Sequence, residues 1–225
     1  MKAQAAGAGQ PDGNLAPQPR MPIRVVVADD HALYRQSLSL LLSLDGDIDV
    51  VGEAANGLDA LEAAADLQPD ILLLDLQMPR LDGIDAVGSL VERMPTGQVI
   101  MLTMSEATED LLAALRAGAN GYLLKSSASE EVLDAIRAVH SGRVVVSPSI
   151  LSSLLHEVLS RAQDSASTSI VTDRHRGLLR RMARGAGPEQ IAAEDQVDED
   201  VVRREFDDLL QALRAAAEPE SMARD

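Results

Sequence analysis

Short apolar runs alternate with longer amphipathic segments through the first 142 residues of the chain. Each run is too short for a helix and lies between polar or turn-forming positions, which predicts buried parallel strands at about 24–28, 50–52, 71–74, 98–102 and 121–124. Apolar residues between them recur at helical spacing, as Leu33, Leu38, Leu41 and Leu42 do, and predict helices at about 32–44, 58–67, 83–93 and 108–117. A capping box of Ser127 and Glu130 predicts a fifth helix, which ends near residue 140. This alternation predicts the α/β fold class, with a doubly wound five-stranded parallel sheet.

The pattern changes after residue 142. Residues 143–149 are expected to be extended, residues of about 150–161 helical, and residues 162–169 (AQDSASTS) a polar hinge. Three helices are predicted beyond it, at about 173–184, 188–194 and 198–213, with Pro188 at the first position of the short second one. We therefore expect a disordered tail (1–21), an α/β domain (22–142), a linker with a helix (143–169), a small all-α helix-turn-helix domain (170–214) and a second tail (215–225).

Composition narrows the functional classes. The chain has no cysteine and only four scattered histidines, which excludes disulfides and predicts no zinc site. No apolar stretch is long enough to span a bilayer, and the N-terminal segment lacks the apolar core of a signal peptide, so we expect a cytoplasmic protein with no membrane contact. The net charge is −16; residues 21–141 hold 7 Lys/Arg against 20 Asp/Glu, and residues 170–213 hold 7 against 10. Neither part is a basic nucleic-acid binder by composition.

Reactive side chains follow four of the predicted strands. Asp29 and Asp30 come after the first, Asp75 after the third, Thr103 after the fourth and Lys125 after the fifth. A single aspartate after a strand is usually a helix cap or a solvated turn residue. For Asp30 the ordinary explanation is a helix cap. Together they would meet at the carboxyl edge of the sheet, where open α/β folds place their chemistry. Converging carboxylates predict a Mg²⁺ site, and Mg²⁺ beside an ammonium and a hydroxyl suits phosphoryl transfer to Asp75.

Four stretches then resemble the receiver domain of response regulators, over about residues 23–141: VVVADDH, ILLLDLQMPRLDG, VIMLTMSE and GANGYLLKSSASEEVLDAIRAV. The resemblance implies that Asp75 is the phosphoacceptor of a sensor histidine kinase. It implies that Mg²⁺ binds to Asp30, Asp75 and the backbone carbonyl of Gln77, and through water to Asp29.

The same resemblance assigns roles to three further residues. Thr103 would be the switch hydroxyl and, with Lys125, part of the catalytic set. Tyr122 would be the switch aromatic; the alternative that it only fills the core stays open. Two enzyme classes fail on visible residues: a haloacid-dehalogenase-type phosphatase needs D-x-D, where this chain has Gln77, and a dinucleotide-binding fold needs glycines that are absent from ADDHAL. The resemblance thus implies a regulator and not an enzyme.

The last domain resembles the LuxR-type helix-turn-helix that follows receivers in the NarL/FixJ family, over about residues 170–213. This implies a transcription regulator that binds DNA, with Arg203 and Arg204 toward the groove, and that forms a homodimer on phosphorylation. The chain departs from the family at positions where family members contact DNA or pack their core. Here Asp195 stands in place of Leu, Val201 in place of Thr, Glu205 in place of His, Asp208 in place of Asn and Ala212 in place of Lys. Carboxylates repel phosphates, so the alternative is an output domain that binds a protein partner instead of DNA.

Overall fold

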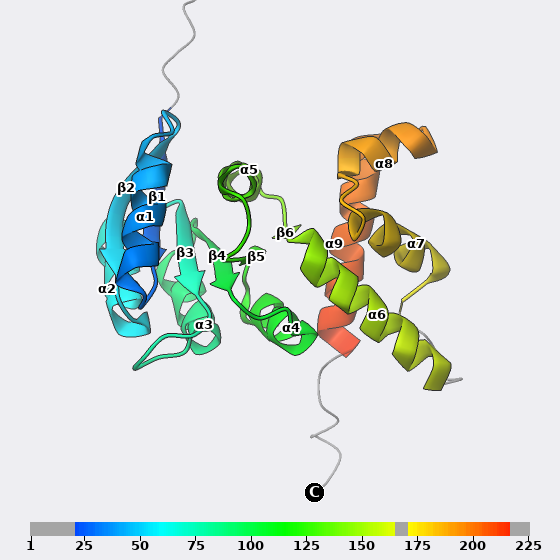
Figure 1. The fold of residues 1–225 in the computed structure, drawn as a ribbon, viewed down its shortest axis with the longest axis horizontal. Coiled ribbons are helices and arrows are strands. Elements are labelled where there is room, and N and C mark those ends of the chain that lie inside the picture. Colours follow the sequence, from blue (N-terminus) through cyan, green and yellow to red (C-terminus); the bar gives the residue numbers. More distant parts are fainter. Residues whose placement is uncertain (1–20, 165–170, 217–225) are drawn as a thin grey trace, which may run out of the picture.

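A computed structural model describes residues 21–164 and 171–216, with side chains described except at 157–164 and 213–216. Figure 1 shows an α/β unit on one side and a group of helices on the other, which begins with the long helix α6 (Pro148–Asp164). Most of the two predicted disordered tails and of the predicted hinge lie outside the described residues. Residues 162–164 of the hinge belong to α6, and residues 215 and 216 of the second tail belong to the last helix, Glu199–Ala216. None of the described helices is both long and apolar enough to cross a membrane.

The first unit is a parallel sheet with the strand order β2-β1-β3-β4-β5-β6. Strands and helices alternate along the chain as β1 (Ile23–Ala28), α1 (Ala32–Ser43), β2 (Ile48–Ala54), α2 (Gly57–Leu67), β3 (Ile71–Asp75), α3 (Gly83–Arg93), β4 (Gln98–Thr103), α4 (Thr108–Ala117), β5 (Gly121–Leu124), α5 (Ser129–His140) and β6 (Val145–Val146). The predicted α/β class and parallel sheet are confirmed. The predicted number of strands is wrong by one, because two valines of the extended linker pair with Gly121 and Tyr122 at the edge of the sheet.

Alternate strand residues enter two cores, one on each face of the sheet. Val26, Leu72, Leu74 and Met101 pack with the side of the sheet that α2, α3 and α4 cover. Val25, Ile71, Leu73 and Ile100 pack on the opposite face with α1 and α5. The near-continuous apolar runs are thereby explained, since a parallel strand covered on both faces has no solvated side.

Two local predictions and one alternative are wrong. Leu33 does not share the buried face of α1, because its side chain is 80% exposed. Asp30 does not cap α1, since His31 occupies that position. The capping box of Ser127 and Glu130 is absent: α5 begins at Ser129 behind Ala128, and the Ser127 hydroxyl lies 3.3 Å from that of Ser147. Ser127 is thus drawn to the segment that follows β6 instead of to its own helix.

The second unit consists of α6 (Pro148–Asp164), α7 (Asp173–Met182), α8 (Pro188–Asp195) and α9 (Glu199–Ala216). Thr172 caps α7 by accepting a hydrogen bond from the His175 amide at 3.1 Å, and Pro188 opens α8 as predicted. Helix α4 of the first unit contacts both α6 and α9. Its Leu111 and Leu112 belong to the same apolar cluster as Leu154 and Phe206, so one continuous core joins the two units.

Candidate functional site

The carboxyl edge of the sheet gathers the predicted reactive residues. The Lys125 Nζ atom lies 2.7 Å from Asp29 Oδ2 and 2.8 Å from Asp75 Oδ2, and all three side chains are at most 7% exposed. The parallel register brings them together, because Ala28 pairs with Leu74 and Thr103 pairs with Leu124, the residues beside the reactive ones. Side chains that are far apart in the sequence therefore form one buried cluster of two carboxylates and one ammonium.

The pKa values of Asp75 and Lys125 are shifted in this cluster, where one ammonium is shared by two carboxylates. Burial raises the pKa of Asp75, and the nearby charge of Asp29 adds to this, while the hydrogen bond and charge of Lys125 oppose it. Burial alone would lower the pKa of Lys125, but its hydrogen bonds to Asp29 and Asp75 and their charges outweigh that effect and raise it. Lys125 is therefore protonated, while Asp75 holds a proton more readily than an exposed aspartate does.

Further ligand atoms surround these carboxylates. Asp29, Asp30, His31 and Asp75 each offer an atom, and these atoms all lie within 4.8 Å of one another. The His31 Nδ1 atom is 2.8 Å from Asp30 Oδ1. Gln77 follows on the loop after β3, and its backbone N–H donates to Asp75 Oδ1 at 3.3 Å. Three carboxylates at this spacing fit a hard divalent cation such as Mg²⁺, which prefers oxygen ligands.

Thr103 and Tyr122 lie deeper beside the cluster. Thr103 ends β4 and is 2% exposed, and its Oγ1 accepts a hydrogen bond from the Ser105 amide at 2.9 Å. Tyr122 is fully buried in β5, and burial together with the charge of Asp110 raises its pKa. Its hydroxyl lies near the Thr103 side chain without the geometry of a hydrogen bond. In this arrangement Tyr122 fills the core, and its predicted role as a switch stays a prediction.

Residues of early α1 also line the cluster, although the sequence pattern did not single them out. Lys125 Nζ lies over the ring of Tyr34, 5.2 Å from its centroid. Arg35 donates from Nη1 to the Asp29 carbonyl at 2.5 Å and from Nε to Glu53 at 3.0 Å. Their place in the first turns of the helix after the Asp pair was the only signal, and it equally fitted residues that simply pack against the sheet.

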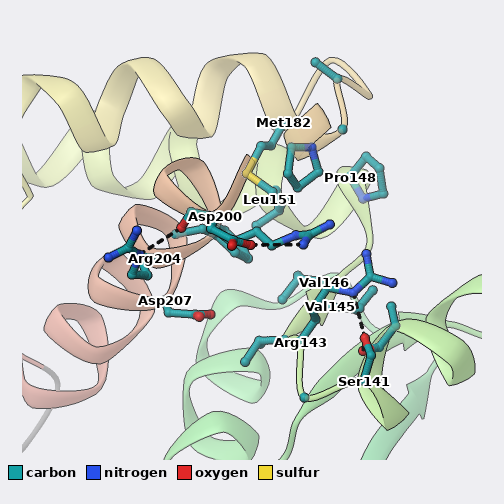
Figure 2. A pocket seen from close by; sticks show the side chains of 18 of the residues that line it. Ser141, Arg143, Val145, Val146, Pro148, Leu151, Met182, Asp200, Arg204 and Asp207 are labelled. Carbon is teal, nitrogen blue, oxygen red and sulfur yellow. Dashed lines mark hydrogen bonds and ion pairs between the residues drawn. The ribbon is translucent and has the colours of Figure 1, made fainter. Parts of the chain in front are cut away.

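The residues predicted to contact DNA lie elsewhere. Arg203 and Arg204 line a cavity of about 630 Å³ between the two units, whose walls come from the α5–β6 connection, α6, the α7–α8 turn and α9. Figure 2 shows Arg143 and Ser141 on one side of it and Asp200, Arg204 and Asp207 on the other. Arg204 donates to the Asp200 carbonyl at 3.1 Å. Arg203 is half-buried in this arrangement and Arg204 is exposed, and the contact of these arginines with DNA stays a prediction.

The unusual acidic residues of the helical unit are paired with its arginines. Asp195 ends α8 and receives two hydrogen bonds from Arg181 of α7, at 2.7 and 2.8 Å. These bonds lower the pKa of Asp195 and raise that of Arg181. Glu205 of α9 forms an ion pair with Arg174 of α7. The departures from the family pattern at Asp195 and Glu205 thus form ion pairs with α7.

Comparison with known proteins gives a consistent family. The response regulator receiver domain family matches residues 25–137. The nitrate/nitrite response regulator protein NarL of Escherichia coli K12 is 32% identical over 201 residues, 89% of this chain and 93% of NarL. The oxygen regulatory protein NreC of Staphylococcus carnosus is 34% identical over 204 residues, 88% of this chain and 94% of NreC.

A solved structure agrees with these relatives. The crystal structure of a LuxR-family two-component response regulator from Aurantimonas sp. SI85-9A1 has a TM-score of 0.59 and 31% identity, covering 61% of this chain and 99% of that one. The receiver match, the relatives that align over most of their length and the parallel sheet with its acidic edge all lead to one conclusion. The chain belongs to the two-component response regulators of the NarL type, in the LuxR family.

Proposed function

We propose that Asp75 accepts a phosphoryl group from a sensor histidine kinase, and that this modification controls the output of the helical unit. The observation that carries the proposal is the buried contact of Lys125 with both Asp29 and Asp75 at the sheet edge. One carboxylate would be enough to form a buried ion pair with Lys125. The second carboxylate makes the cluster electrostatically costly, and groups perturbed in this way gather at functional sites.

In the proposed reaction an oxygen of Asp75 attacks the phosphorus of a phosphohistidine. The O–P bond forms while the N–P bond breaks, and the electron pair of the broken bond returns to the imidazole. A bound Mg²⁺, held by Asp30, Asp75 and the Gln77 carbonyl and through water by Asp29, would neutralise charge on the phosphoryl oxygens. The Lys125 ammonium and the Thr103 hydroxyl donate to those oxygens and orient the group.

The test uses a small-molecule phosphodonor, acetyl phosphate. The wild-type chain is expected to take up one phosphoryl group when Mg²⁺ is present, and Asp75→Asn is expected to take up none. Asp82→Asn is the matched control: it removes a carboxylate of the same loop, which caps α3 by accepting from the Ile84 amide at 2.9 Å. Equal uptake by Asp75→Asn would remove Asp75 from this role, and undiminished uptake in excess chelator would remove Mg²⁺ from the reaction.

For the output we propose control of transcription through DNA binding by α8 and α9, with a homodimer formed on phosphorylation. The full-length similarity to NarL supports this output. A second output, contact with a protein partner, is favoured by the pairing of Arg174 and Arg181 with acids, which withdraws cations from phosphate binding. A retardation assay on genomic fragments, with and without acetyl phosphate, separates the two. Light scattering on the same samples tests the dimer.

A further inference from the structure

Tyr34 of α1 contacts the buried ammonium at the centre of the site. The Lys125 Nζ atom lies 5.2 Å from the centroid of the Tyr34 ring, while the same atom is 2.7 Å from Asp29 and 2.8 Å from Asp75. The Lys125 side chain is only 7% exposed, so its ammonium meets these three groups in a site largely closed to water. An aromatic face therefore completes a binding site for the ammonium that two carboxylates alone would leave open.

The ring is held in place by apolar packing. Tyr34 packs against the core cluster on the α1 and α5 face of the sheet. The electron-rich face of an aromatic ring attracts a cation, and the attraction is stronger when water is excluded. Since α1 begins three residues after Asp29, the strand that delivers the carboxylate also positions the ring.

We propose that Tyr34 is a positioning residue that holds Lys125 inside the pocket and thereby sets how strongly Lys125 competes with Mg²⁺. Lys125 contacts Asp75 Oδ2 and Asp29 Oδ2, and these carboxylates are also the ones that a divalent cation would use. Whatever stabilises the ammonium at these oxygens weakens the cation at the same oxygens. The ring also keeps Lys125 close to Asp75, where it would meet an incoming phosphoryl group; this second consequence rests on the proposed function.

A double-mutant cycle on the full chain tests the first consequence without any phosphorylation. Calorimetric titration with MgCl₂ gives the Mg²⁺ dissociation constant. Tyr34→Leu should tighten Mg²⁺ binding by about twofold to thirtyfold, the range that one cation–π contact supplies between exposed and desolvated sites. Tyr34→Phe keeps the ring and should leave the constant unchanged. In the Lys125→Ala background Tyr34→Leu should have no further effect, because the cation that the ring holds is gone.

Controls separate the contact from a loss of packing. Tyr34→Met is a second variant without a ring and should behave like Tyr34→Leu, and Leu33→Ala, at the exposed neighbouring position, should change nothing. An equal effect of Tyr34→Leu with and without Lys125 would overturn the proposal. So would a Tyr34→Phe variant that behaves like Tyr34→Leu, because the hydroxyl would then be the essential group.

Phosphorylation gives an independent second measurement. At saturating Mg²⁺ and with acetyl phosphate, Tyr34→Leu should be phosphorylated more slowly than wild type and Tyr34→Phe at the wild-type rate. Tighter Mg²⁺ binding with slower phosphorylation is a pair of opposite changes that general destabilisation does not produce. Unchanged phosphorylation in Tyr34→Leu would overturn the positioning role. If the wild type takes up no phosphoryl group, the proposed function fails, while the Mg²⁺ cycle still decides the role of Tyr34.

Discussion

The salt dependence of DNA binding should reveal how many arginines of the helical unit are free. The described side chains from α7 to α9 include seven arginines. Four of them, Arg174, Arg176, Arg181 and Arg203, form ion pairs with carboxylates. Arg204 donates to a backbone carbonyl, and Arg180 and Arg184 have no acidic partner within the described part of the chain. Of these seven described arginines, at most three are therefore available for phosphates without breaking an ion pair.

The number of available arginines sets the expected salt dependence of DNA binding. Each neutralised phosphate contributes about −0.9 to the slope of log affinity against log salt. Three free arginines give a slope of about −2.7, or roughly a 40-fold loss of affinity between 50 and 200 mM salt. All seven would give about −6.3 and a loss of roughly 6,000-fold. The two cases differ far beyond the error of a titration.

The perturbation is the double variant Asp195→Asn and Glu205→Gln. It frees Arg181 and Arg174 with little change of side-chain volume, so the slope should steepen to about −4.5 and the loss to roughly 500-fold. Exposed ion pairs contribute little to stability, so the fold should be kept. The matched control is Glu194→Gln with Asp208→Asn, which removes the same charge but frees no arginine, because Glu194 accepts from Gln190 at 3.0 Å.

The assay is fluorescence anisotropy of the full chain with random-sequence duplex DNA at several salt concentrations, with and without acetyl phosphate. Two results would refute the reasoning. A wild-type slope near −6 would mean that the ion pairs open at no cost when DNA arrives. An equal change of slope in both double variants would mean that net charge, and not the release of particular arginines, governs binding.

Three further predictions concern the first unit. Lys125→Ala should tighten Mg²⁺ binding, since a competing cation is lost, and should abolish any change of oligomeric state on phosphorylation; calorimetry and light scattering check this. Asp75→Asn should raise the melting temperature at neutral pH: the pKa of Asp75 is raised by burial, so its ionised form costs stability that appears as pH rises through that pKa and vanishes below the ordinary value of about 3.9. The gain should be about 2–4 °C for each kcal/mol recovered, and melts from pH 5 to 7.5 showing no difference would contradict it. Gly83→Ala should destabilise the fold, because a Cβ there would lie 2.3 Å from the Asp75 carbonyl oxygen, whereas Gly88→Ala in the same helix meets nothing within 4 Å and should stabilise by up to about 1 kcal/mol; denaturant unfolding compares the two.

The reactive edge could be predicted from the sequence because it depends only on where each strand ends and on the strands being parallel. Parallel strands all end at one edge, so the residue after each strand is placed as soon as the strand is recognised. That is why Asp29, Asp75 and Lys125 were found without any knowledge of packing. The sixth strand could not be found in the same way, since Val145 and Val146 form a strand only by pairing with Gly121 and Tyr122. The hydroxyl contact that takes Ser127 away from its helix depends on the same pairing.

The acidic departures in the helical unit show where sequence comparison and structure lead to different conclusions. Read along the chain, Asp195 and Glu205 are charges placed where the family has an apolar or a basic residue, and they suggest a damaged DNA-binding surface. In the structure each forms an ion pair with an arginine of α7. The partner of Asp195 is Arg181, and the partner of Glu205 is Arg174, which is distant in the sequence. A carboxylate and an arginine that pair with each other cancel both a repulsion and an attraction toward phosphate. The consequence for DNA is a smaller number of contacts rather than a repulsive surface, and only the salt slope, not the affinity at one salt concentration, distinguishes the two.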